Sequence, residues 1–213
     1  MKKSIAIILC LVMALSVLLT GCGSDADKLV GTWKATIDMS SYLNDTIAEA
    51  DAEIAEYFSI DDLTFDVIMT FGENGECAME ADEDSWSDMA EKLGEQMKVS
   101  YEAYFKDLLK SMGVDMTVDE LLSASGTTMD DMIDEMLDEM MSSDVLSEME
   151  SEGYFKLQDG MIYISEEKDD AFDEDAANPY TLDGDNLTIK ASEDEEDEDY
   201  IDFLYPLELK KVK

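Results

Sequence analysis

Three pairs of turn residues, each between two short runs of β-forming residues, constrain this chain more than any other feature. They are Asn74-Gly75, Asp159-Gly160 and Asp183-Gly184. Asn-Gly is the strongest short hairpin signal, because a type I′ turn needs positive φ at both central positions. The runs on either side of these pairs therefore predict three tight antiparallel hairpins.

Alternation of apolar and polar residues adds a first and a last strand. Residues 29–38 alternate after Gly31, and residues 200–212 predict the last strand, with Pro206 at an edge, bulge or bend. The hairpin strands are predicted at residues 63–71 and 76–81, 154–158 and 161–165, and 180–182 and 187–191. Tight turns then alternate with long connections, which places all the long connections at one end of an up-and-down sheet.

Apolar residues at helical spacing fill the longer connections. Residues 40–58 predict one helix after the first strand, and residues 84–151 predict a helical insertion after the third. In the insertion, Gly113 is expected to end a long helix, and Thr117 and Thr128 are expected to cap the two that follow. The predicted fold class is α+β: an eight-stranded antiparallel up-and-down barrel, or a strongly curved sheet, with a helical insertion between strands three and four.

The start of the chain has the pattern of a secretory signal. A basic Met1-Lys2-Lys3 precedes an apolar run over residues 4–19 that is too short for a membrane span. Leu19-Thr20-Gly21-Cys22 resembles the lipobox of bacterial lipoproteins, in which the cysteine is acylated, for example with palmitate, and becomes the first mature residue. An ordinary cleaved signal with an incidental cysteine is the alternative.

The lipoprotein resemblance implies a division of the chain and a location. Residues 1–21 would be the signal peptide, residues 22–28 a short tether after lipidated Cys22, and residues 29–213 the β domain. The protein is then expected on the outward face of the bacterial cell membrane, held by its lipid anchor.

Composition excludes several kinds of partner and site. The formal net charge is −40, and the chain has no arginine and no histidine, so bidentate phosphate clamps and imidazole ligands are missing. The negative electrostatic potential of such a chain repels nucleic acid and anionic membrane surfaces, whereas cations and basic proteins remain possible partners. With Cys10 in the signal and Cys22 acylated, Cys77 is the one thiol left, and we interpret it as a packing residue.

Gly31-Thr32-Trp33 at the start of the first strand resembles the G-x-W signature of lipocalins, and the later strand-turn-strand pattern is similar to lipocalin-like domains of bacterial lipoproteins. The resemblance implies that Trp33 closes the narrow end of a barrel and that small apolar ligands enter at the opposite mouth. Lipocalins commonly stack an arginine of the last strand on this tryptophan. Here Lys210 or Lys211 is expected to cover the ring by a cation–π contact. The lipid anchor would lie near the closed end, and the acidic mouth would point away from the membrane.

The leading functional hypothesis is a non-enzymatic module that binds a small apolar or cationic ligand in a cavity under the insertion. Its expected lining combines strand residues with methionines of the last inserted helix: Phe65, Val67, Met69, Phe71, Met132, Met136 and Met140. The methionines of the last inserted helix could instead bind Cu(I) through their thioether sulfurs. Ile133 and Leu137 lie on the same face of that helix, however, which favours an ordinary role of the methionines in packing. No cofactor and no specific metal site are predicted.

Two further hypotheses stay open. The acidic rim of the barrel is expected either to dock a basic protein partner or to bind cations weakly, Ca²⁺ included, through the acid runs at residues 169–175 and 193–199. An enzyme is not favoured, since the chain has no histidine, no G-x-S-x-G elbow and no glycine-rich phosphate loop.

Overall fold

The computed structural model describes residues 24–141, 149–166, 177–192 and 204–213. In this part of the chain the strands are β1 (Gly31–Asp38), β2 (Thr64–Phe71), β3 (Glu76–Ala81), β4 (Ser151–Gln158), β5 (Met161–Ser165), β6 (Ala177–Asp183), β7 (Asn186–Ile189) and β8 (Leu207–Lys211). The helices are α2 (Asp25–Leu29), α3 (Ser40–Ala50), α4 (Ala52–Ala55), α5 (Glu83–Ser111), α6 (Val118–Ser125) and α7 (Met129–Met140).

The strands form a closed antiparallel barrel in the order of the chain, from β1 to β8. Closure comes from pairing of β1 with β8, where Trp33 lies opposite Lys211 and Lys34 opposite Lys210. The predicted fold class is therefore confirmed, and of its two forms the closed barrel is the one found. The helices α5, α6 and α7 lie between β3 and β4, as the insertion was predicted to lie.

The three predicted hairpins are all present, but their turns differ. Both Asp159 (φ 54°) and Gly160 (φ 83°) have positive φ, as a type I′ turn requires. In the first hairpin only Gly75 (φ 83°) does, because the loop is longer: Gly72 N–H donates to the Glu76 carbonyl at 2.8 Å. The type I′ prediction for Asn74-Gly75 is thus wrong, although the strands it joins were correctly placed.

The predicted single helix over residues 40–58 is also wrong, because it breaks at Asp51. This residue has extended backbone (φ −157°, ψ 104°), and its side chain accepts hydrogen bonds from the Glu53 and Ile54 N–H groups. Aspartate satisfies free N–H groups better at a helix start than it fits a helix interior, so α3 ends and α4 begins there.

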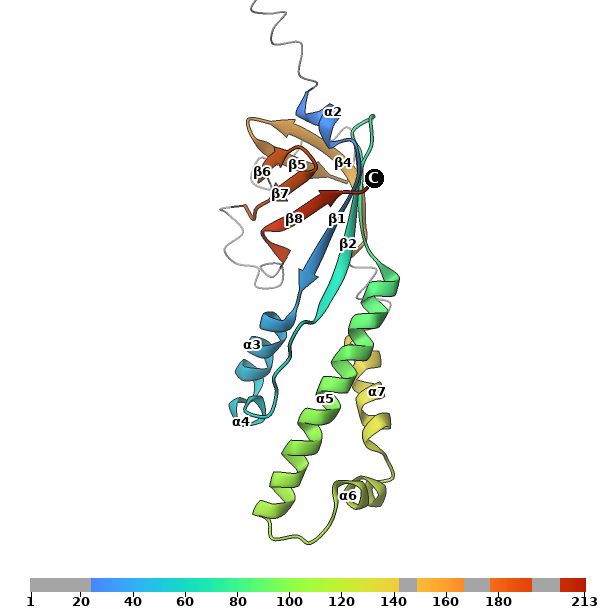
Figure 1. The fold of residues 1–213 in the computed structure, drawn as a ribbon, viewed down its shortest axis with the longest axis vertical. Helices are drawn as coiled ribbons and strands as arrows, with labels where there is room; N and C mark the ends of the chain where they lie inside the picture. Colours follow the sequence, from blue (N-terminus) through green and yellow to red (C-terminus); the bar gives the residue numbers. More distant parts are fainter. Residues whose placement is uncertain (1–23, 142–148, 167–176, 193–203) are drawn as a thin grey trace, which may run out of the picture.

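Helices and hairpins occupy opposite ends of the barrel. Figure 1 shows α3, α4, α5 and α7 projecting from one end, whereas α2 lies at the other end with the hairpins. Helix α5 has 29 residues and is therefore about 43 Å long at 1.5 Å per residue. The predicted caps of α6 and α7 are confirmed, since Thr117 and Thr128 each form a capping box.

The hairpin end of the barrel is sealed around Trp33. Its side chain is fully buried, and its indole N–H donates to the Leu29 carbonyl at 2.6 Å. The Lys211 ammonium lies 5.1 Å from the centroid of the ring and also donates to the Lys28 carbonyl at 2.6 Å. Of the two lysines expected to cover Trp33, Lys211 is the one that does, and it ties α2 to the barrel at the same time.

At the helical end, the first turns of α5 pack against β2. Trp86 packs edge-on against Phe65 of β2, with the ring centroids 5.1 Å apart and the planes at 86°. Farther along α5, Gly94 lets α7 approach closely, because a Cβ there would lie 2.8 Å from Leu137 Cδ1. Helix α7 therefore packs on α5 rather than across the barrel.

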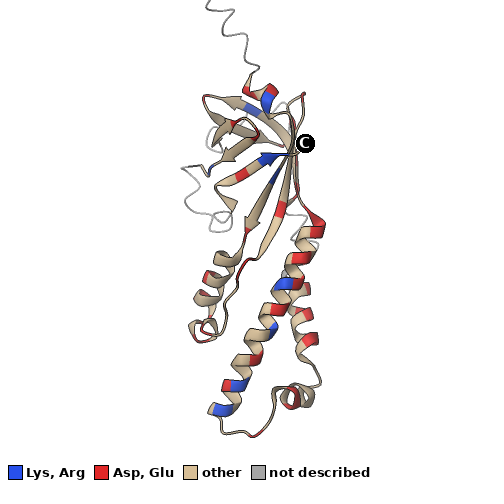
Figure 2. Cartoon of the chain, in the orientation of Figure 1, with Lys and Arg blue, Asp and Glu red and all other residues tan. Residues whose placement is uncertain are grey.

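Acidic residues are far more frequent than lysines in this chain, and many of them lie on α5 and α7 (Figure 2). Four ion pairs join described residues that are far apart in the sequence: Lys213 with Asp185, Lys34 with Asp66, Lys92 with Asp62, and Lys98 with Asp130. The last of these ties α5 to the acidic face of α7, where it offsets part of the repulsion along that helix.

Candidate functional site

The candidate site is a hollow of about 260 Å³ inside the barrel. Residues of every strand from β2 to β8 line it, together with Tyr205 just before β8. Its lining includes the start of β4, the end of β7 and the start of β8, so it lies toward the end where the long connections emerge. The side chains facing it are mostly apolar: Met69, Met79, Ile162, Ile164, Ile189 and Leu207.

Strand alternation determines which residues reach this hollow. Residues directly opposite each other on antiparallel strands lie on the same face of the sheet. Asn178 is opposite Ile162, which is 1% exposed, and Ile189 is opposite Leu207. All four therefore point into the barrel, and Asn178 is the polar member of an otherwise apolar group.

Asn178 is only partly hydrogen bonded. Its side-chain N–H donates to the Tyr205 hydroxyl at 3.4 Å, whereas its Oδ1 is buried and has no partner among the described residues. Most buried polar atoms in proteins have a partner, so Asn178 Oδ1 is an acceptor that is available to a further group in the hollow.

Cys77 lines the same hollow from β3 and is 8% exposed. Burial raises the pKa of its thiol from 9.0 to about 11, because the thiolate would lose its hydration. Gly153 is the cross-strand neighbour of Cys77 and, having no side chain, leaves room beside the thiol. A larger residue does not fit at position 153, because its Cβ would lie 2.5 Å from the Ser165 carbonyl oxygen. At neutral pH the thiol is protonated, so it contributes an almost apolar wall and not a nucleophile.

The predicted strand residues all lie inside the barrel. Phe65, Val67, Met69 and Phe71 are each at most 4% exposed, which identifies the inward face of β2. Of these, only Met69 lines the hollow, whereas Phe71 packs against Phe155 at the hairpin end. Gly31 and Trp33, named for the lipocalin-like motif, open β1 at that same end.

Two of the three predicted helix methionines, Met132 and Met136, are not among the described residues that line this hollow. Met132 and Met136 are half-buried on α7 and pack against the apolar core from the helical arm. Met140 is the last residue of α7, and its side chain lies outside the described part, as do Cys22 and the acid runs at residues 169–175 and 193–199.

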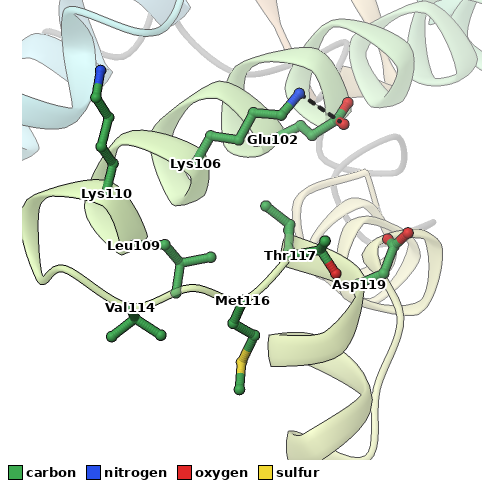
Figure 3. A pocket seen from close by; sticks show the side chains of 9 residues that line it. Glu102, Lys106, Leu109, Lys110, Val114, Met116, Thr117 and Asp119 are labelled. Carbon is green, nitrogen blue, oxygen red and sulfur yellow. Dashed lines mark hydrogen bonds and ion pairs between the residues drawn. The ribbon is translucent and has the colours of Figure 1, made fainter.

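A second hollow lies at the far tip of the helical arm, between the end of α5 and the start of α6 (Figure 3). It is about 520 Å³ and more open, with Val114 and Met116, both 41% exposed, at its edge. Lys106 reaches toward Glu102, 3.4 Å away, and Asp119 lies across the opening. Because carboxylates offset the lysine charge there, the tip offers no defined anion site, and the barrel hollow is the better candidate.

Within the described ranges, no three His, Cys, Asp or Glu side chains come together in a way that could hold a metal ion. Nor does any described helix have the length and apolar character needed to cross a membrane. No protein-family model, no curated protein and no solved structure matches the chain.

Sequence reasoning missed Asn178, Tyr205 and Cys77 as lining residues. The strand predicted at residues 180–182 in fact begins at Ala177, so Asn178 was left in a loop. A signal was present, because Asn178 and Tyr180 continue the alternation of that strand, but Pro179 between them obscured it.

Proposed function

We propose that this protein is a lipid-anchored binding protein of the bacterial cell envelope, with a lipocalin-like barrel that holds a small apolar or cationic ligand. The observation that carries the proposal is the apolar hollow inside the barrel, about 260 Å³ in volume. Binding cavities for drug-sized molecules are roughly 300–1,000 Å³, and benzene fits a cavity of about 150 Å³. The ligand is therefore a compact molecule, of about one or two rings.

Filling the hollow is favourable for a simple physical reason. Side chains around an empty apolar space lose dispersion contacts, and an apolar ligand restores them while leaving water. The surrounding barrel is rigid, because all its strands are paired. A rigid, preformed site saves the ligand the cost of ordering the protein.

The proposed anchor agrees with the direction in which the chain runs. Helix α2 begins at Asp25, shortly after Cys22, and lies at the hairpin end of the barrel (Figure 1). An acyl chain on Cys22 would hold this end at the bilayer. The helical arm and its acidic α7 would then extend away from anionic headgroups, which repel them.

The proposal assigns the protein no catalysis. The chain has no histidine to act as a base, and Cys77 keeps its proton because burial raises its pKa to about 11. The described residues that line the hollow are uncharged, which suits binding, and among them there is no acid–base pair.

Native mass spectrometry of the protein from its own host, delipidated and gently purified, tests the proposal. A bound small molecule is expected, and the Ile189→Phe variant, which places a ring in the hollow, should lose it. Thr188→Phe adds the same ring on the outer face of β7 and should keep the ligand. Protein that is always empty, with no small apolar compound protecting Cys77 from a thiol reagent, would contradict a binding function.

One observation favours a second candidate, an acidic surface that docks a basic partner. Asp134, Glu135 and Asp138 of α7 are exposed, and no ion pair is found for them within the described part of the chain. Such an interface predicts association that weakens steeply with salt and with the double change Asp134→Asn and Asp138→Asn. Association that is indifferent to both would exclude this candidate and leave the barrel proposal untouched.

A further inference from the structure

One acceptor in the hollow has unused hydrogen-bonding capacity. Asn178 Oδ1 is buried, and among the described residues nothing donates to it. The amide nitrogen differs from it, because one of its two N–H groups donates to the Tyr205 hydroxyl at 3.4 Å. A group entering the hollow therefore meets an oxygen of Asn178 that has no partner in the described part of the chain, whereas the amide nitrogen already has one.

The other residues that line the hollow restrict the kind of ligand group that can donate to Asn178 Oδ1. The described residues that line the hollow include no charged side chain. A buried ammonium would thus have no carboxylate beside it among these described residues, and an isolated buried charge is strongly unfavourable. A neutral donor, in contrast, satisfies the oxygen at little desolvation cost.

We infer that the ligand of this hollow is a compact, neutral, apolar molecule with one hydroxyl or N–H group that donates to Asn178 Oδ1. The inference rests on the proposed binding function and narrows it. Of the two ligand classes kept open above, it selects the neutral one and adds a single polar end. That end lies beside Asn178 and Tyr205, and the apolar body lies against Met69, Ile162 and Ile189.

Three probes of nearly equal size test the inference on the purified protein. Cyclohexanol carries a donor, cyclohexanone carries only an acceptor, and methylcyclohexane carries neither. Their affinities are measured by nuclear magnetic resonance titration, with protection of Cys77 from a thiol reagent as a second readout. Cyclohexanol is expected to bind about fivefold more tightly than cyclohexanone, the ratio that one net hydrogen bond of about 1 kcal/mol supplies.

Asn178→Leu keeps the size of the side chain and removes the oxygen. In this variant the preference for cyclohexanol should disappear while methylcyclohexane still binds. Thr188→Val, which removes a hydroxyl from the outer face of the neighbouring strand, is the matched control and should keep the preference of about fivefold.

The outcomes separate the two proposals. Equal binding of all three probes, or a preference for cyclohexanone, overturns the donor inference and leaves the binding function standing. A preference that survives in Asn178→Leu overturns it as well. Failure of all three probes to bind or to protect Cys77 overturns the binding function itself.

Discussion

Replacing Lys211 with methionine tests how the hairpin end is sealed. The substitution keeps the apolar stem and removes the ammonium, which lies 5.1 Å from the Trp33 ring centroid and 2.6 Å from the Lys28 carbonyl oxygen. A cation–π contact at such a site contributes about 0.5–1 kcal/mol, and a hydrogen bond about 1 kcal/mol net. The free energy of unfolding should therefore fall by about 1.5 kcal/mol.

Urea unfolding followed by circular dichroism measures this loss. With a denaturant slope of about 2 kcal/mol per molar, the midpoint should fall by about 0.7 M. Lys211→Arg should retain the native midpoint or exceed it, since a planar guanidinium stacks on an indole ring better than an ammonium does. Lys210→Met is the control, because Lys210 is the exposed neighbour and makes no contact with Trp33.

The reasoning fails if Lys211→Met lowers the free energy of unfolding by less than about 0.5 kcal/mol, which is the usual range for a surface substitution. It also fails if Lys210→Met causes an equal loss. Either result would mean that α2 and Trp33 are held by packing alone.

Three other predictions concern the barrel wall. Gly153→Ala should destabilise the protein by about 1–3 kcal/mol in thermal unfolding, because the added Cβ would lie 2.5 Å from the Ser165 carbonyl oxygen. An unchanged melting temperature would show that no such clash occurs. The Cys77 thiol should have a pKa of about 11 in the native protein, against 9.0 in the unfolded chain. At pH 8 a thiol reagent should therefore react with Cys77 at least about a hundredfold more slowly in the native protein than in urea. Equal reaction rates would contradict the burial of this side chain. Burial raises the pKa of Asp66, but hydrogen bonds from Lys34 and Thr36 outweigh this and keep the pKa below its ordinary value. The ionised Asp66 carboxylate therefore stabilises the fold at pH values above the unfolded pKa of 3.8. In urea unfolding, the native protein should be more stable than Asp66→Asn in that range, and the difference should disappear as pH falls below 3.8. A difference that persists at lower pH would refute this role of the carboxylate.

Local sequence signals located most of the barrel. The turn residues, with glycine at the positive-φ positions 75, 160 and 184, marked the three hairpins, and alternation of apolar residues marked the strands beside them. The capping boxes at Thr117 and Thr128 marked two helix starts. These signals are readable because each depends on the backbone needs of a few adjacent residues.

Signals that depend on distant contacts were harder to interpret. The α7 methionines were expected near the barrel mouth, yet Met132 and Met136 lie in the helical arm, because Gly94 makes α5 the surface on which α7 packs. Asn178 was not predicted as a site residue, since its role depends on the opposite strand and on Tyr205, 27 positions away.

The sequence by itself determined that the chain forms three hairpins, a long helical insertion and an acidic surface, because turn geometry, helical spacing and charge are properties of neighbouring residues. Only the tertiary structure decided that the sheet closes, that Lys211 and not Lys210 covers Trp33, and that an unpaired acceptor faces an apolar hollow. Those features depend on which strands meet and on how completely side chains from separate strands fill the space between them, and packing of this kind exists only when the whole barrel has formed.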